Sequence, residues 1–240
     1  MKGARKYLAV ATWLAASVAA AGCGGDLDFD LTPQTFNLDF GQQSGTVPAI
    51  ACSDATVQAA CGDAPSFTVD TTSATTGAPS RVDVALGCDG NGMCFAQASA
   101  RVAQSVAVLQ DDDLSTRIER HALGLLKEVD VAYTVPANSV TIDIPKVDVY
   151  AGPAGSTRET DPGVAVVGST QPIAAGAVIT DRQHIVIDDD TPARPVIEHA
   201  IEHKQDFVFI VVATPVMTAG SPVPAGAVQV DIFPHIKIGF

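Results

Sequence analysis

The sequence predicts a mainly β protein, a β-sandwich with two short accessory α-helices. Apolar and polar residues alternate in several separate runs, one run near position 210 is apolar at every position, and only two segments show helical spacing. The alternating runs number roughly nine or ten, at intervals typical of a sandwich. We therefore expect two layers of strands with a helix at an edge or over one face.

The alternating runs are expected to be half-buried strands. They centre on Phe36 to Phe40, Val82 to Leu86, Val102 to Val108, Val129 to Val135, Val140 to Ile144 and Val147 to Val149. Pro136, Ala137 and Asn138 have the composition of a hairpin turn between two of these runs.

Two later runs have special features. Every residue from Phe207 to Ala213 is apolar, so both faces of a strand there would be apolar. This predicts a central strand that is covered on both faces. The chain then alternates from Val228 to Ile238, and we expect this last strand to be bent or bulged at Pro234.

Helical spacing occurs twice. Apolar residues recur at three- and four-residue steps from Leu114 to about Lys127, after a cap at Asp113 or Ser115. The second helix is expected from about Arg194 to Gln205, with Thr191 as its cap and Pro192 in its first turn. Its apolar face carries Ile197, Ala200, Ile201 and Lys204, and its polar face carries Glu198, His199, Glu202 and His203.

The first 22 residues have the pattern of a secretory signal peptide. A basic start with Lys2, Arg5 and Lys6 precedes an apolar run, and the small residues Ala20, Ala21 and Gly22 lie before Cys23. No later segment approaches the length of about 20 apolar residues that a membrane helix needs. We expect cleavage before Cys23, a tether over 23–34 and a sandwich domain over 35–240, with a subdivision near 68–80 as an alternative.

The stretch Ala20-Ala21-Gly22-Cys23 resembles the lipobox of bacterial lipoproteins. The resemblance implies a diacylglycerol on the thiol of Cys23, an acyl chain such as palmitate on its new amino group, and attachment to the lipid bilayer of the cell envelope. Ala20 replaces the usual Leu, so simple cleavage at an Ala-x-Ala site is the alternative. In this family an Asp after the cysteine retains the protein at the inner membrane; Gly24 therefore favours the outer membrane.

The body of the chain is similar to uncharacterised lipoproteins of soil bacteria that have an outer membrane. The similarity lies in the order of elements from Cys88 onward, including the segment Val149 to Gly155 and the last apolar strands. It implies no function.

The charge of the chain disfavours nucleic acid as a partner. Loss of Lys2, Arg5 and Lys6 with the signal peptide changes the formal charge from −13 to −16. An acidic surface repels phosphate, and binding to nucleic acid or anionic lipid needs clustered Lys or Arg. The sequence does not specify a protein or glycan partner.

Five cysteines occur in an exported chain, and lipidation of Cys23 leaves an even number for disulfides. The remaining four allow three pairings. We favour Cys52 with Cys61 and Cys88 with Cys94, because the members of each pair are close in sequence.

Two motifs suggest metal sites. His199, Glu202 and His203 fit the H-x-x-E-H pattern of inverted zinc peptidases, but no Glu follows Glu202 as that family's third ligand. Asp89 and Asn91 resemble the start of a calcium loop that has no closing Glu. A solvated helix face and a tight turn explain the same residues, as helix caps explain the runs Asp111 to Asp113 and Asp188 to Asp190.

No coherent active site and no cofactor-binding fingerprint occur in the sequence. We therefore expect a membrane-anchored envelope lipoprotein with a non-enzymatic binding or structural role and no cofactor. The alternative is a zinc-dependent hydrolase centred on His199, Glu202 and His203, and a second alternative is a calcium-stabilised adhesion module.

Overall fold

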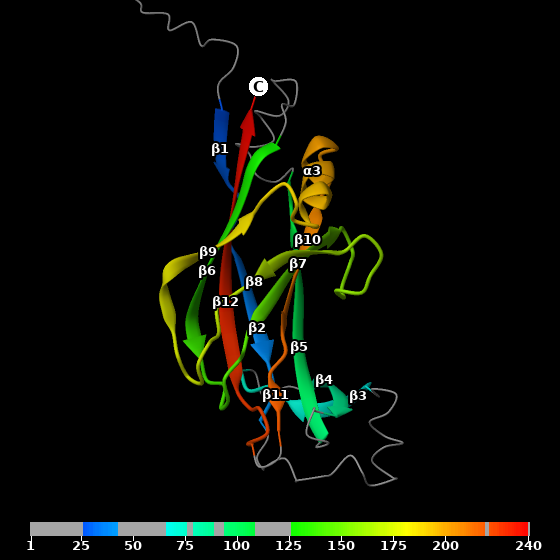
Figure 1. Cartoon of the computed structure of the whole chain (residues 1–240), viewed down its shortest axis with the longest axis vertical. Coiled ribbons are helices and arrows are strands. Elements are labelled where there is room, and N and C mark those ends of the chain that lie inside the picture. Colours follow the sequence, from blue (N-terminus) through cyan, green and yellow to red (C-terminus); the bar gives the residue numbers. More distant parts are fainter. Residues whose placement is uncertain are drawn as a thin grey trace, which may run out of the picture.

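A computed structural model describes residues 26–42, 66–75, 79–88, 94–108, 126–218 and 221–239. Over these ranges the protein is mainly β, with two antiparallel sheets and one α-helix. Figure 1 shows the sheets as two layers along the long axis, with the helix beside one end. The mainly β fold was predicted correctly.

The first sheet has five strands. They are β1 (Asp26–Asp30), β2 (Gln34–Asp39), β6 (Leu126–Asn138), β9 (Ile179–Ile187) and β12 (Ala227–Gly239). The order is β1-β12-β6-β9, and β2 pairs with the other end of the same edge of β12.

The second sheet has seven strands. They are β3 (Ser66–Thr72), β4 (Pro79–Cys88), β5 (Cys94–Val106), β7 (Val147–Pro153), β8 (Ala165–Ser169), β10 (Phe207–Ala213) and β11 (Val216–Met217). The order is β3-β4-β5-β10-β7-β8, with β11 paired to β5.

The two sheets pack on one apolar core. Alternate residues of β2, β6, β7 and β12 are buried and belong to a single cluster together with the inward residues of β10. At one side β8 lies against β9, where Gly168 leaves room for Ile185, and at the other side Gln104 of β5 donates to the backbone oxygen of Thr35 in β2. Both long sides of the sandwich are therefore closed by direct contacts.

Strand β10 is central, as the sequence predicts. It pairs with β5 on one side and β7 on the other, and all of its residues are buried. Phe207, Phe209 and Val211 face the main core, while Val208, Ile210 and Val212 form a separate cluster on the outer face. The uniform apolar run is explained by cover on both faces.

Strand β12 passes through Pro234 without a register shift, which corrects the predicted bulge at the proline. The shifts lie between Gln229 and Asp231 and between Lys237 and Ile238. The carbonyl of Pro234 accepts a hydrogen bond from the N–H of Leu31, in the short connection between β1 and β2. Pro234 lies opposite the connection between β1 and β2, where neither strand pairs with β12. The missing N–H of the proline therefore removes no hydrogen bond between strands.

The described helix, α3 (Arg194–Glu202), confirms the second predicted helix but not its cap. Ala193 occupies the N-cap position without a side-chain hydrogen bond, and Pro195 rather than Pro192 lies in the first turn. The hydroxyl of Thr191 instead donates to Asp188, whose N–H it accepts. Ile197, Ala200 and Ile201 are buried in the main core.

Other sequence predictions differ from the structure. Pro136, Ala137 and Asn138 continue β6 and do not form a turn, and 140–144 is a loop with one isolated bridge from Ile144 to Ile173. The helix expected from Leu114 lies outside the described residues except at its end, where Leu126 and Lys127 are in β6.

The sheet begins before the expected domain boundary. Strand β1 lies within the range expected to be a tether and pairs with the end of β12. The expected subdivision near 68–80 falls in the hairpin of β3 and β4. Asp39 joins this hairpin to β2, because its carboxylate accepts hydrogen bonds from Ser73, Ala74 and Thr75.

Candidate functional site

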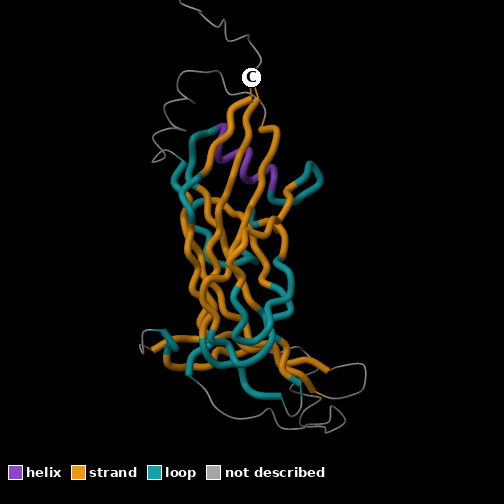
Figure 2. The backbone as a smooth tube through the Cα atoms, turned by 90° about the vertical axis from the view of Figure 1, so that its left-hand side faces the viewer, coloured by secondary structure: helices purple, strands orange, loops and turns teal. Residues whose placement is uncertain are grey.

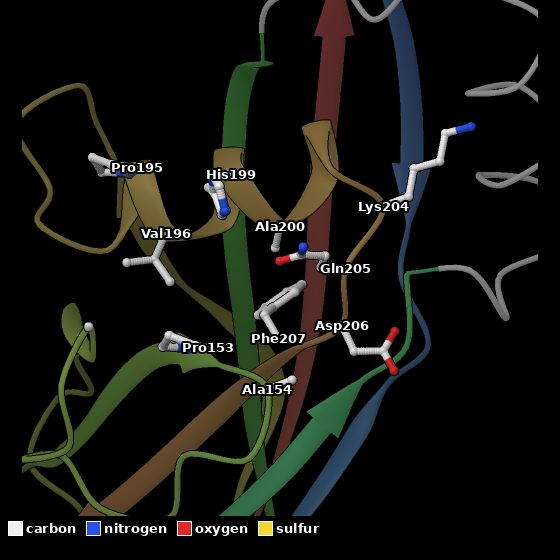
Figure 3. A pocket seen from close by; sticks show the side chains of 11 residues that line it. Pro153, Ala154, Pro195, Val196, His199, Ala200, Lys204, Gln205, Asp206 and Phe207 are labelled. Carbon is white, nitrogen blue, oxygen red and sulfur yellow. The ribbon is translucent and has the colours of Figure 1, made fainter.

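A cavity of about 740 Å³ lies between α3 and one end of the seven-stranded sheet. Figure 3 shows α3 on one side of it and the Pro153–Ala154 segment on the other, with Phe207 between them. The lining is Pro153, Ala154, Gly163, Pro195, Val196, His199, Ala200, Lys204, Gln205, Asp206 and Phe207. Its walls are therefore mainly apolar, with polar groups from the end of the helix and the segment that follows.

The amphipathic spacing of α3 creates this arrangement. One face of the helix, with Ile197 and Ile201, enters the core, and the adjacent face turns Val196 and His199 toward the cavity. The floor is Phe207, which is only 1% exposed and begins β10 directly after the helix connection. Helix, connection and central strand thus form consecutive parts of one wall.

The N-terminus of α3 is attached to the five-stranded sheet by Arg194. Its guanidinium donates to the backbone oxygen of Leu126 at 2.8 Å and to the carboxylate of Glu198 at 3.0 Å, and it pairs with Asp189 at 2.7 Å. Arg194 is 11% exposed in its side chain. These bonds fix the helix across the end of the sandwich, so the cavity has one rigid wall.

The C-terminus of α3 ends in a Schellman motif. The N–H of Gln205 bonds the carbonyl of Ala200 at 2.8 Å, and the N–H of Lys204 bonds that of Ile201 at 3.2 Å. Lys204 has φ 54°, the left-handed conformation that glycine usually provides at this position. It is the one described non-glycine residue with a positive φ.

The charged groups at the cavity differ in their partners. Asp206 accepts the N–H of Val108 at 3.2 Å, so its carboxylate caps the end of β5. No ion pair or hydrogen bond joins the Lys204 ammonium to another described residue. The cavity lining therefore carries two charges that are not in an ion pair with another described residue, the Lys204 ammonium and the Asp206 carboxylate.

A second apolar surface lies on the outer face of β10 and is covered. Val208, Ile210 and Val212 are buried there, with Ala103, Tyr150 and Val164 packed against them. The connection from β7 to β8, residues 154–164, folds over this strip. Gly152 permits the approach, since a Cβ there would lie 2.6 Å from a methyl of Val164.

An ion pair holds this connection in place. The Arg101 guanidinium binds both carboxylate oxygens of Glu159, at 2.5 and 2.7 Å, and it also pairs with Asp83. Burial by itself would raise the pKa of Glu159, but the hydrogen bond and charge of Arg101 hold that pKa below its usual value. Asp161 closes the turn by accepting the N–H groups of Thr157 and Arg158.

The predicted zinc residues lie on α3, but only His199 lines the cavity. Glu202 and His203 are exposed, and Nδ1 of His203 hydrogen-bonds the carbonyl of His199 at 2.9 Å within the helix. The centroids of the two imidazole rings lie 4.0 Å apart, and the ring planes are tilted by 33°. Within the described ranges, no three His, Cys, Asp or Glu side chains come together as a metal site.

Several other predicted site residues lie outside the described residues: Cys23, Cys52, Cys61, Asp89, Asn91 and the run Asp111 to Asp113. The backbones of Cys88 and Cys94 are directly opposite each other at the end of the β4–β5 pair. In the other acidic run, Asp188 bonds Thr191 and Asp189 pairs with Arg194 just before the helix.

Sequence reasoning identified α3 and His199 but missed the cavity. One further wall comes from Pro153 and Ala154 at the end of β7, which is far from α3 in the sequence. Another comes from Phe207 at the start of β10, which is not part of the apolar spacing of the helix. Lys204 gave no signal of the cavity, because the predicted helix ran to Gln205 and placed Lys204 on its apolar face, whereas the helix ends at Glu202 and Lys204 follows it in the left-handed conformation.

Comparison with known proteins gives little guidance. No family model matches the chain, and no curated protein matches it. A solved structure described as "carbohydrate-binding modules from the beta-sandwich super family" is similar at 10% identity and a TM-score of 0.24. The match covers 84% of this chain and 54% of that chain, and a likeness this distant carries no argument about a ligand. No described helix has the length and apolar character required to span a bilayer.

Proposed function

We propose that this protein is a lipid-anchored lipoprotein of the bacterial envelope whose sandwich domain binds a small apolar or amphiphilic ligand beside α3. The single observation that carries the binding role is the open apolar cavity of about 740 Å³. Ligand sites of proteins are mostly concave, apolar and of about 300–1,000 Å³, with a few polar groups. The cavity has this size and composition.

The position of the cavity supports a role at a membrane surface. Lipidation would occur at Cys23, three residues before Asp26, so the lipid would start within about 11 Å of the first residue of β1. Asp26 pairs with Lys127 at 2.5 Å, and the neighbouring Leu126 carbonyl accepts from Arg194 of α3. Figure 1 shows the start of β1 and the helix at the same end of the sandwich, and Figure 2 shows the helix at that end in a second view.

An anchor at this end would keep the cavity near the bilayer. A ligand that partitions into membranes could then reach the cavity over a short path. Two or more acyl chains at one cysteine anchor stably, since each buried methylene contributes about 0.8 kcal/mol. The anchor at Cys23 and the cavity beside α3 are formed by different residues, and both support binding of an amphiphile near a membrane.

Binding of a neutral fluorescent dye tests the cavity. N-phenylnaphthylamine, added to protein expressed from the full chain with Cys23→Ser, should gain fluorescence with saturation at one site. Val196→Trp places a large ring in the cavity and should abolish this signal, because Val196 lines the cavity and is only half buried.

Val178→Trp is the matched control. Val178 is 55% exposed and does not line the cavity, so this variant should bind the dye as the unsubstituted domain does. Equal dye binding by the Val196→Trp and Val178→Trp variants would refute the proposed site.

Labelling with radioactive palmitate tests the anchor. Cells that produce the unsubstituted chain should incorporate label into the protein and retain it in the membrane fraction. Cys23→Ser should remove both properties, and continued labelling of that variant would refute lipidation at Cys23.

A further inference from the structure

Lys204 occupies a backbone position that is unfavourable for a lysine. At φ 54° a side chain with a Cβ crowds its own backbone, and glycine would avoid this cost. Non-glycine residues in this conformation occur preferentially at functional sites, where the side chain has a use. The strained residue lines the apolar cavity beside α3.

The ammonium of Lys204 also differs from those of the other described lysines. Lys127 pairs with Asp26 at 2.5 Å, Lys146 pairs with Asp148 at 2.9 Å, and Lys237 lies 3.8 Å from Asp26. The chain has 27 acidic and 14 basic residues, so a lysine meets a carboxylate easily. Within the described ranges, Lys204 alone among these four lysines has no such partner.

Lys204 lines the cavity, and its ammonium points out of it (Figure 3). In Figure 3 the ammonium of Lys204 extends outward from the end of α3, away from Phe207 and the other apolar lining. Asp206, the other charged lining residue, accepts the N–H of Val108, and in Figure 3 its carboxylate points in a different direction from the Lys204 ammonium. An amphiphile with its chain against Pro153, Pro195 and Val196 would have its polar end outside the apolar lining, where Lys204 is the available cation.

We propose that Lys204 recognises the carboxylate of a single-chain amphiphile whose apolar chain occupies the cavity. A carboxylate carries one charge, which one ammonium can match. A phosphate carries about −1.5 to −2 charges and generally needs several donors. This inference rests on the proposed function, because it names the ligand class of the same cavity.

Competition between dodecanoate and dodecanol for bound N-phenylnaphthylamine tests the inference. Lys204→Met keeps the aliphatic stem but removes the charge, so it should weaken dodecanoate about fivefold and leave dodecanol unchanged. Lys204→Arg should retain most of the dodecanoate affinity. Lys146→Met removes a paired lysine outside the cavity and should change neither affinity.

Lys204→Gly separates recognition from a purely structural role. Glycine relieves the left-handed strain, so the melting temperature should rise by about 2–4 °C while dodecanoate affinity falls. A rise in melting temperature with unchanged dodecanoate affinity would overturn the inference.

The remaining outcomes are also distinguishable. Equal weakening of dodecanoate and dodecanol by Lys204→Met would overturn the inference and leave the apolar site in place. Dodecyl phosphate that competes more tightly than dodecanoate and responds to Lys204→Met would overturn the carboxylate assignment. Failure of the unsubstituted domain to bind the dye would instead refute the proposed function itself.

Discussion

Strand β10 contributes to two apolar surfaces, of which one is covered by other residues and the other borders an open cavity. On the outer face, Val208, Ile210 and Val212 are buried under Ala103, Tyr150 and Val164, the last of which belongs to the connection 154–164. At the start of the same strand, Phe207 forms the floor of a cavity that no described segment fills. Phe207 itself is only 1% exposed, and the apolar lining open to a ligand is formed by Pro153, Pro195 and Val196. The first surface is therefore part of the folded core, whereas the second borders an open space.

The difference arises from how each neighbouring segment is held. Residues 154–164 are fixed onto the sheet by the bidentate bond between Arg101 and Glu159 and by the close approach at Gly152. Helix α3 is held at its N-terminus by Arg194, and after its Schellman ending the chain continues along the wall of the cavity. One segment closes over apolar residues, and the other leaves a space beside them.

Truncation on the covered surface should have the largest effect. Ile210 is 0% exposed, so Ile210→Ala should lower the free energy of unfolding by about 3 kcal/mol through lost burial and a residual cavity. Urea unfolding measures the change. A loss below about 1 kcal/mol would mean that the outer cluster is not a packed core.

Removal of the ion pair should have a smaller and pH-dependent effect. The side chains of Arg101 and Glu159 are 17% and 24% exposed, and Glu159→Gln should cost about 1–2 kcal/mol at pH 7. The pKa of Glu159 lies below its ordinary value of 4.5, so its contribution is complete above that pH. The contribution is lost as the pH falls through the lowered pKa.

The difference in stability between the unsubstituted chain and Glu159→Gln should therefore shrink below about pH 4.5 and vanish in stronger acid. Urea unfolding over this pH range provides the measurement. Glu202→Gln, which changes an exposed carboxylate on α3, serves as the control and should show no such difference. A pH-independent gap for Glu159→Gln would contradict the assigned role of the pair.

Truncation at the open surface should affect stability least. Val196 lines the cavity and is half buried, so Val196→Ala should change the free energy of unfolding by less than about 1 kcal/mol. The same variant should weaken dye binding severalfold, because it removes apolar contact with the ligand. Unchanged dye affinity would place the bound dye elsewhere.

Alternating and uniformly apolar runs predicted β2, β4, β10 and β12, because burial on one or both faces leaves a direct signal in the sequence. Strands β8 and β9 were missed, since neither has a clear alternation: Gly168 interrupts one, and the polar residues Thr180, Asp181 and Arg182 follow the first residue of the other. The register of the strands, and the absence of a bulge at Pro234, depend on neighbouring strands that are distant in sequence.

The candidate site was only partly predictable for a similar reason. The two faces of α3 were predicted from residue spacing, and Ile197, Ala200 and Ile201 are buried as expected. The cavity depends on the approach of Pro153 and Phe207 from separate strands, which local patterns do not encode. The unpaired state of Lys204 likewise becomes visible only when the positions of all nearby carboxylates are given.

The most direct test of the account compares the two surfaces of β10 in one experiment. Methyl-labelled protein, expressed from the full chain with Cys23→Ser, is titrated with dodecanol and followed by NMR. If the ligand enters the cavity, the methyls of Val196, which line it, should show saturable shifts, and those of the covered residues Val208, Ile210 and Val212 should show none. Shifts confined to the covered cluster, or no saturable shift at Val196, would contradict binding in the cavity.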